Sequence, residues 1–254
     1  MATTYVQSVE RALLILQYLQ ENKEGLGVTE ISHRLDVAKS TTHRLLASLL
    51  RNGYVQQDEQ TEKYRLGLKL LELGNTITES LDIRKVAQPF LLELSEQTGE
   101  TAHLVLLEQG EVVYIDKIES SATIGMKSRI GKRAPAYCTG VGKAILCYLT
   151  EKRVDQIIDS GRLYQYTKNT ITDKNLLKKE LSSIRERGYS LDLEEHEEGI
   201  RCVGAGILDH HGQVVAGISI AGPSMRMTDQ KLEDCAKKIM VCAEGISCHL
   251  GYRP

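Results

Sequence analysis

The stretch AKSTTHRLLASLLRNGYV, residues 38–55, places polar and basic residues in front of a leucine-rich run. Its spacing predicts an amphipathic helix, whose buried face is formed by Leu45, Leu46, Leu49 and Leu50. Gly53 is suited to end that helix. No Asp or Glu occurs between Val37 and Gln57, although Lys and Arg do. A helix with hydroxyl and basic groups at an exposed start is suited to contact a nucleic acid.

The flanking segments predict small elements packed around this helix. Residues 6–20 have helical spacing with Val9, Leu13, Leu16 and Leu19 on the apolar side. A short helix, EISHRL, follows Thr29, which we expect to be its N-cap, and a tight turn leads into residue 39. After the polar helix, YVQQD and KYRLG predict a β-hairpin.

Together these elements predict a winged helix-turn-helix. In that fold the first residues of the second helix of the motif approach base edges and phosphates. Arg44 is the foremost candidate for base recognition. The full predicted set of DNA contacts is Ser8, Arg11, Lys39, Ser40, Thr41, Thr42, Arg44 and Arg65. The alternative is a packing module of three helices whose polar helix start is only solvated.

Composition sets limits on the class of protein. The chain has 254 residues, a net charge of −2, 41% hydrophobic and 26% charged residues, which are values of an ordinary globular protein. Positive charge is therefore only local. The first residues lack a signal-peptide pattern and no apolar run is long enough to span a membrane, so we expect a cytoplasmic location. Six scattered cysteines without CxxC spacing predict reduced, mostly buried thiols.

The remainder predicts an α+β domain with two groups of antiparallel strands. A connecting helix is expected at 68–81 and another at 82–99, with a kink or break at Pro89. Further helices are expected at 142–149, near 151–159, at 174–187 and at 228–249. Strands are expected at 101–108, 111–120, 124–131, 189–195, 200–209 and 213–222.

Several longer motifs resemble the IclR family of bacterial transcription regulators over nearly the whole chain. They are QSVERALLIL, STTHRLLASLLRNGYV, YRLGLKLLELG, GKRAPAYCTGVGKAIL, EEGIRCVGAGILD and VVAGISIAGP. The resemblance implies a winged helix-turn-helix at 1–67, a linker helix at 68–81 and a GAF-like effector-binding domain at 82–254. It also implies homodimers or homotetramers on a pseudo-palindromic DNA operator. The segments MKSRIGKRAPAYCTGVGKAIL and EEHEEGIRC are most similar to the branch that senses 2-keto-3-deoxygluconate and related sugar acids.

The resemblance also implies a pocket for an effector, the small molecule that controls DNA binding. Its residues are Met126, Gly140, Val141, Asp192, Cys202, Ser219 and Ala221. Backbone N–H groups at Gly140 to Gly142 would suit a carboxylate, Ser219 could donate a hydrogen bond and Asp192 could accept one. Many family members have Ser in place of Ala221, which removes one donor here.

Other functions remain open from the residues alone. We predict no cofactor and no metal, although His103, Asp192, His196 and Cys202 are a conceivable metal-ligand set. An enzyme would use Cys138 or Cys202 with a histidine, but no nucleophile motif surrounds either. The GVGK sequence lacks the P-loop spacing. A protein-binding winged helix, or an activator responding to aromatic or short 2-oxo acids, are further alternatives.

Overall fold

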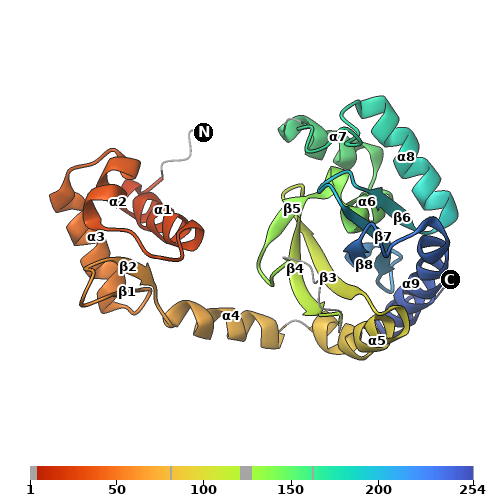
Figure 1. Cartoon of the computed structure of the whole chain (residues 1–254), viewed down its shortest axis with the longest axis horizontal. Coiled ribbons are helices and arrows are strands. Elements are labelled where there is room, and N and C mark those ends of the chain that lie inside the picture. The colour runs from red at the N-terminus through yellow and green to blue at the C-terminus, as the bar shows by residue number, and fades with distance from the viewer. Residues whose placement is uncertain (1–4, 81, 121–127, 162, 254) are drawn as a thin grey trace. The chain divides into compact units, whose positions relative to one another are not determined.

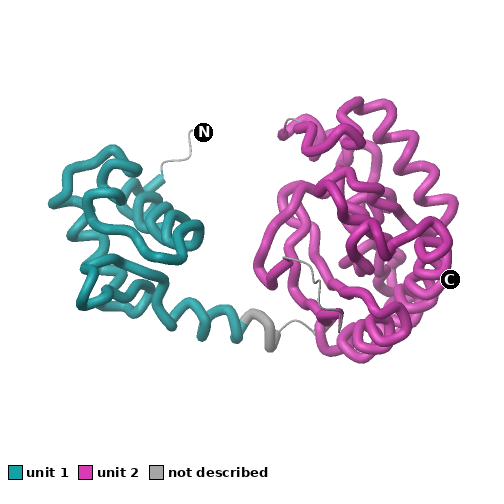
Figure 2. The backbone as a smooth tube through the Cα atoms, in the orientation of Figure 1, with its two compact units in different colours: residues 1–80 teal, residues 81–254 magenta. Residues whose placement is uncertain are grey.

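The computed structural model describes residues 5–80, 82–120, 128–161 and 163–253. The chain divides into two compact units, Met1–Ser80 and Leu81–Pro254 (Figure 2). The connecting helix belongs to the first unit in this division, and the boundaries expected at residues 67 and 81 stay a prediction. Each unit is described by itself.

Unit 1 contains three helices, a small hairpin and then a further helix. The hairpin is antiparallel with Val55 opposite Leu66, which confirms the predicted pair of strands. Leu26 adds a bridge to Tyr64 and so joins the hairpin to the segment before the second helix. The elements are α1 (Gln7–Glu21), α2 (Val28–Leu35), α3 (Lys39–Arg51), β1 (Val55–Gln57), β2 (Tyr64–Leu66) and α4 (Lys69–Ser80) (Figure 1).

The core of unit 1 differs from the predicted apolar face of α1. Ile15 and Leu19 are buried, whereas Val9 and Leu13 are each 51% exposed. The helix has two adjacent apolar stripes. Ile15 and Leu19 are four residues apart and so lie on one face of the helix, which is the face that packs against α2 and the hairpin. In α3, Leu46 is buried but Leu50 is 42% exposed, so the predicted leucine face was too wide.

Helix α2 begins one residue earlier than Thr29. Its N-cap is Gly27, whose backbone N–H donates to the Glu30 carboxylate at 2.8 Å. The predicted cap at Thr29 is therefore wrong, because Glu30 reaches back to Gly27 at the start of the helix and accepts its N–H. Asp36 ends α2 in the left-handed region at φ 51°, and this tight turn delivers the chain to α3.

Unit 2 is built on an antiparallel sheet of strand order β5-β4-β3-β8-β7-β6. Helices α5 and α9 pack on one face, and α6 packs on the other against β7 and β8 (Figure 1). The strands are β3 (Thr101–Glu108), β4 (Glu111–Ile118), β5 (Arg133–Pro135), β6 (Ser190–Leu193), β7 (Ile200–Leu208) and β8 (Val214–Pro223). The helices are α5 (Asp82–Thr98), a 3-10 turn η1 (Ala136–Cys138), α6 (Gly140–Leu146), α7 (Glu151–Ser160), α8 (Lys174–Arg187) and α9 (Asp229–His249).

Alternation along the strands separates two hydrophobic clusters. Leu104, Val203 and Ile220 belong to the cluster under α5 and α9, whereas Val105 and Val112 belong to the cluster around α6 and α8. Successive strand residues point to opposite faces. The strand neighbours of the first set, among them His103, Cys202 and Ser219, therefore face α6 and line a pocket there.

Two predictions about unit 2 need correction. Pro89 does not break α5, which runs through it from Asp82 to Thr98, because packing of Ala87 and Leu91 in the core stabilises the helix despite the missing N–H donor. The alternative of a kink at Pro89 stays a prediction. Of the strand expected at 124–131, residues 124–127 lie outside the described residues and 128–131 form no strand; β5 follows at Arg133 instead.

Candidate functional site

A row of polar groups crosses the α6 face of the sheet in unit 2. In the strand register, Asp192 lies opposite Cys202, and Cys202 opposite Ala221. In the next row, Ser219 lies opposite His103. Because residues two apart on a strand share a face, these five residues from four strands lie on one side of the sheet.

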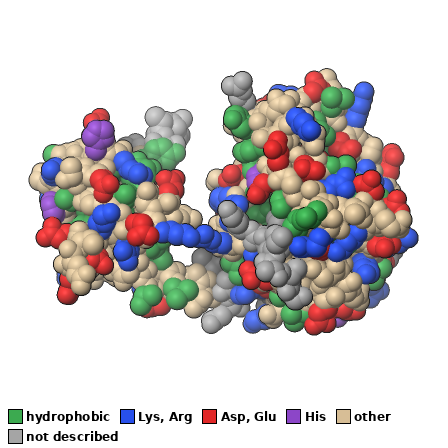
Figure 3. Space-filling view, in the orientation of Figure 1, with side chains coloured by type: hydrophobic (Ala, Val, Ile, Leu, Met, Phe, Trp, Pro, Cys, Tyr) green, Lys and Arg blue, Asp and Glu red, His purple; other side chains and the backbone are tan. Residues whose placement is uncertain are grey.

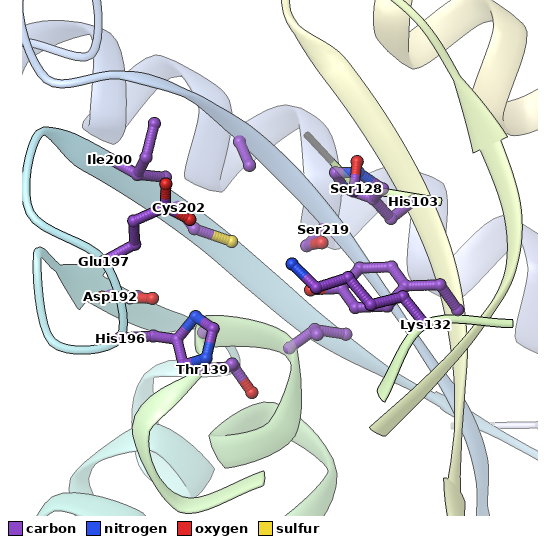
Figure 4. A pocket seen from close by; sticks show the side chains of 14 residues that line it. His103, Ser128, Lys132, Thr139, Asp192, His196, Glu197, Ile200, Cys202 and Ser219 are labelled. Atoms are coloured by element: carbon purple, nitrogen blue, oxygen red, sulfur yellow. The ribbon is translucent and has the colours of Figure 1, made fainter. Parts of the chain in front are cut away.

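This face forms a pocket of about 560 Å³, its open mouth included. Six of the seven residues expected for the effector line it, and the seventh, Met126, lies outside the described residues. The six are Gly140, Val141, Asp192, Cys202, Ser219 and Ala221. Figure 4 shows side chains from several strands and the loop after β6 converging on this space. Whether they bind an effector stays a prediction.

Eight further residues line the pocket that were not predicted to be part of it. The sequence does contain a signal for His103: in the strand predicted at 101–108 it lies two residues from Val105, so both residues are expected on the same face of the sheet. The loop residues had no comparable signal. The eight are His103, Tyr114, Ser128, Lys132, Thr139, His196, Glu197 and Ile200.

The glycines around α6 serve close packing of the helix on the sheet. A Cβ on Gly140 would lie 3.0 Å from the Cys202 sulfur, and one on Gly204 would lie 2.7 Å from the Val141 nitrogen. Lys143 is fully buried and forms an ion pair with Glu195. The GVGK sequence is therefore a packing motif with an internally paired lysine rather than a phosphate loop.

Asp192 is the buried carboxyl group of the pocket. One oxygen accepts the Glu195 backbone N–H at 2.7 Å, and only 5% of the residue is exposed. Burial raises the pKa of Asp192 to about 7; the hydrogen bond from the Glu195 backbone and the charge of Lys143 oppose the rise, and the Glu195 carboxylate adds to it. Desolvation disfavours the charged form. Near neutral pH this group can therefore either accept or donate a hydrogen bond.

His103 is a neutral imidazole in the wall of the pocket. Burial lowers its pKa to about 3, and Lys117 contributes in the same direction. Nε2 lies 2.7 Å from the Ser128 hydroxyl, and Nδ1 is buried without a hydrogen-bond partner among the described residues. The Tyr114 ring packs edge-on at 5.1 Å. The pocket thus offers uncharged polar atoms as well as a carboxyl group.

The cysteines do not provide an ionised nucleophile. Burial raises the pKa of Cys202 to about 12 and also raises that of Cys138, so both thiols are protonated at neutral pH. A thiol in this state is a poor nucleophile. No group of three or more His, Cys, Asp or Glu in the described part of the chain could hold a metal ion.

Helix α3 of unit 1 presents its polar start to solvent. Its N-cap, Ala38, makes no side-chain capping bond; Lys39, Ser40 and Arg44 are exposed, and Thr41 is half-buried. Thr42, by contrast, is fully buried and its hydroxyl lies 3.4 Å from the Ala38 carbonyl oxygen. Its predicted DNA contact is therefore wrong, because α3 packs with this side chain toward the core.

The remaining predicted contacts lie on other elements of unit 1. Ser8 is exposed near the start of α1, and Arg11 is half-buried. Arg65 on β2 is half-buried, and its Nε is buried without a hydrogen-bond partner among the described residues. On the face in Figure 3, basic and acidic side chains alternate over both units. Any attraction for DNA is thus local, as the net charge of −2 indicates.

No helix within the described ranges is sufficiently long and apolar to cross a membrane.

A winged helix followed by a second unit with a polar pocket is the arrangement of a DNA-binding transcription regulator. Residues 8–59 match the IclR helix-turn-helix domain. Residues 75–248 match the family described as bacterial transcriptional regulator IclR C-terminal. The chain belongs to the IclR family.

Two relatives from Escherichia coli K12 match nearly end to end. The HTH-type transcriptional regulator KdgR is 40% identical, covering 97% of this chain and 94% of its own. The regulator XynR is 38% identical, covering 97% and 98%. This similarity supports the expected place of the chain in the sugar-acid branch of the family.

Solved structures agree with the architecture. The crystal structure of the Thermotoga maritima IclR protein has a TM-score of 0.80 and 37% identity, covering 98% of this chain and all of its own. The C-terminal domain of E. coli KdgR has a TM-score of 0.62 and 36% identity, covering 68% of this chain and all of its own. The expected winged helix-turn-helix followed by an α+β effector-type domain is confirmed.

Proposed function

We propose that this regulator is a cytoplasmic repressor, not an enzyme, whose operator binding is released by a small carboxylic acid. The favoured effector is a sugar acid such as 2-keto-3-deoxygluconate. The observation that carries the proposal is the pocket itself, where Asp192, Ser219 and backbone groups at Gly140 converge. Such groups can bind the hydroxyls and oxo group of a sugar acid, and similarity to KdgR supports the choice.

DNA binding is assigned to the start of α3. Lys39, Ser40, Thr41 and Arg44 supply the contacts there, with Ser8, Arg11 and Arg65 as supporting phosphate contacts. A symmetric dimer, or a pair of dimers, binds a pseudo-palindrome, because two-fold protein symmetry matches two half-sites. The exposed Leu68 and Leu71 beside and on α4 are apolar surface suited to pairing with a second copy.

A mobility-shift assay on DNA upstream of the protein's own gene tests the proposal. We expect a specific complex that 2-keto-3-deoxygluconate dissociates. Coupling between the two sites is typically about 1–3 kcal/mol, so the effector should weaken operator binding several-fold or more. A shift produced only by aromatic or short 2-oxo acids would replace the sugar acid and keep the regulator. If no complex forms with any DNA, the proposal is overturned and the enzyme or protein-binding alternatives are favoured.

A further inference from the structure

Lys132 lies at the mouth of the pocket, in the loop before β5. The backbone around it is held against β4: the Tyr114 N–H donates to the Lys132 carbonyl at 3.1 Å, and the Gly131 N–H donates to the Tyr114 carbonyl at 2.8 Å. Its side chain extends into the pocket instead of away from it (Figure 4). A lysine stem positioned in this way keeps its ammonium close to whatever occupies the pocket.

Other lysines near the pocket are already paired. Lys143 bonds to Glu195, and Lys117 bonds to Glu119 and to the Ser128 carbonyl. The Lys132 ammonium makes no such bond to any described residue, and Lys132 is the one Lys or Arg among the described lining residues. Its charge is therefore available to a ligand.

The wall opposite Lys132 carries acceptor groups. Asp192 and Glu197 contribute carboxyl groups, and His196 an imidazole. The charge of Lys132 is felt across the pocket, since it lowers the pKa of His196 further after burial has done so. A ligand that uses both sides needs an anionic end toward Lys132 and a hydroxylated part toward Asp192 and Ser219.

We propose that Lys132 is the specificity residue that selects an acid over the corresponding neutral sugar, by pairing with the effector's carboxylate. The inference rests on the proposed function and deepens it. It places the charge recognition on a side chain rather than on the start of α6. That helix spans only Gly140–Leu146, and so it contributes a small dipole.

The test compares an acid with its uncharged counterpart by calorimetric titration of the full-length protein. The acid is 2-keto-3-deoxygluconate, and the counterpart is 3-deoxyfructose, in which a hydroxymethyl group replaces the carboxylate. We expect Lys132→Gln to weaken binding of the acid on the order of tenfold or more, since charge-assisted hydrogen bonds are the strong ones. Binding of 3-deoxyfructose should not change.

Two further variants make the result specific. Lys132→Arg should retain most of the preference for the acid. Lys152→Gln, at an exposed position on α7 of the same unit, should behave as the wild type with both compounds. Melting temperatures of the free variants should all agree, because each residue is exposed.

The outcomes separate the two proposals. If the wild type binds the acid and Lys132→Gln binds it equally well, the role of Lys132 is overturned and the sugar-acid function stands. If the variant loses both compounds equally, Lys132 shapes the pocket without reading charge, and the inference is again overturned. If the wild type binds neither compound, the sugar-acid effector is overturned together with this inference.

Discussion

The polar groups of the two candidate sites differ in burial: those on α3 of unit 1 are exposed to water, whereas those in the pocket of unit 2 are buried. On α3, Lys39 and Arg44 are exposed, so the DNA contacts proposed for them lie at a surface where salt screens their charge. In the pocket, Asp192 and His103 are buried and burial shifts both pKa values. The proposed recognition of DNA would therefore depend on the position of exposed cations, whereas the proposed recognition of a small ligand would depend on desolvated groups.

The largest expected effect concerns α4, which is part of neither the proposed DNA-contacting start of α3 nor the pocket. Leu68 and Leu71 are 73% and 61% exposed and three residues apart, so they share one face. Replacing both with Asp should separate the protein into monomers. Operator affinity should fall about a hundredfold or more, because linked binding of two half-sites is lost. Light scattering and fluorescence anisotropy measure the two effects.

The matched control is Leu176→Asp on α8, where the leucine is 58% exposed. It should leave both the mass and the operator affinity unchanged. A double Leu68/Leu71 variant that remains a dimer would exclude this face as the contact between copies.

The exposed cations of α3 should matter for DNA and not for folding. Arg44→Ala should weaken operator binding about tenfold or more, since a bidentate arginine–guanine pair contributes about 1–3 kcal/mol of discrimination. Its melting temperature should equal that of the wild type. Arg153→Ala on α7, another exposed arginine, serves as the control. Unchanged operator affinity in Arg44→Ala would remove this residue from the reading surface.

The buried polar groups should show the reverse behaviour. Ser219→Ala should weaken 2-keto-3-deoxygluconate binding about three- to tenfold, the value of one hydrogen bond, and leave operator binding without effector intact. Ser182→Ala on the exposed face of α8 is the control. An equal loss of operator affinity would mean that the two units do not separate these functions.

The last expected effect concerns stability and not binding: the desolvated Asp192 should make the free energy of unfolding depend on pH. The pKa of Asp192 rises from 3.8 to about 7 on folding, so between these values the folded chain holds a proton that the unfolded chain has released. The free energy of unfolding therefore falls as pH rises across this range. Asp192→Asn should remove that loss.

Melting curves over a pH series measure this difference. The variant should gain stability relative to the wild type as pH rises through the range, with a constant difference above about 7, the pKa in the folded chain. A difference that does not change with pH would show that Asp192 is ionised at all these pH values in the folded chain.

Local sequence determined much of unit 1. The polar start of α3, the turn before it and the hairpin after it follow from residues close together in the chain, because helix caps and hairpins depend on local backbone preferences. The family motifs extended this to the pocket residues Gly140, Asp192 and Ser219. These predictions needed no knowledge of packing.

Tertiary structure decided which side chains are buried and what charge they carry. Val9 and Leu13 looked like core, but packing of α1 on its neighbours buried Ile15 instead. Thr42 turned inward for the same reason. Lys132 and His103 are 29 residues apart in sequence, and only the strand register and a loop held to β4 bring them to one pocket. Ionisation then follows from burial, which no local pattern contains, because desolvation depends on everything packed around a group.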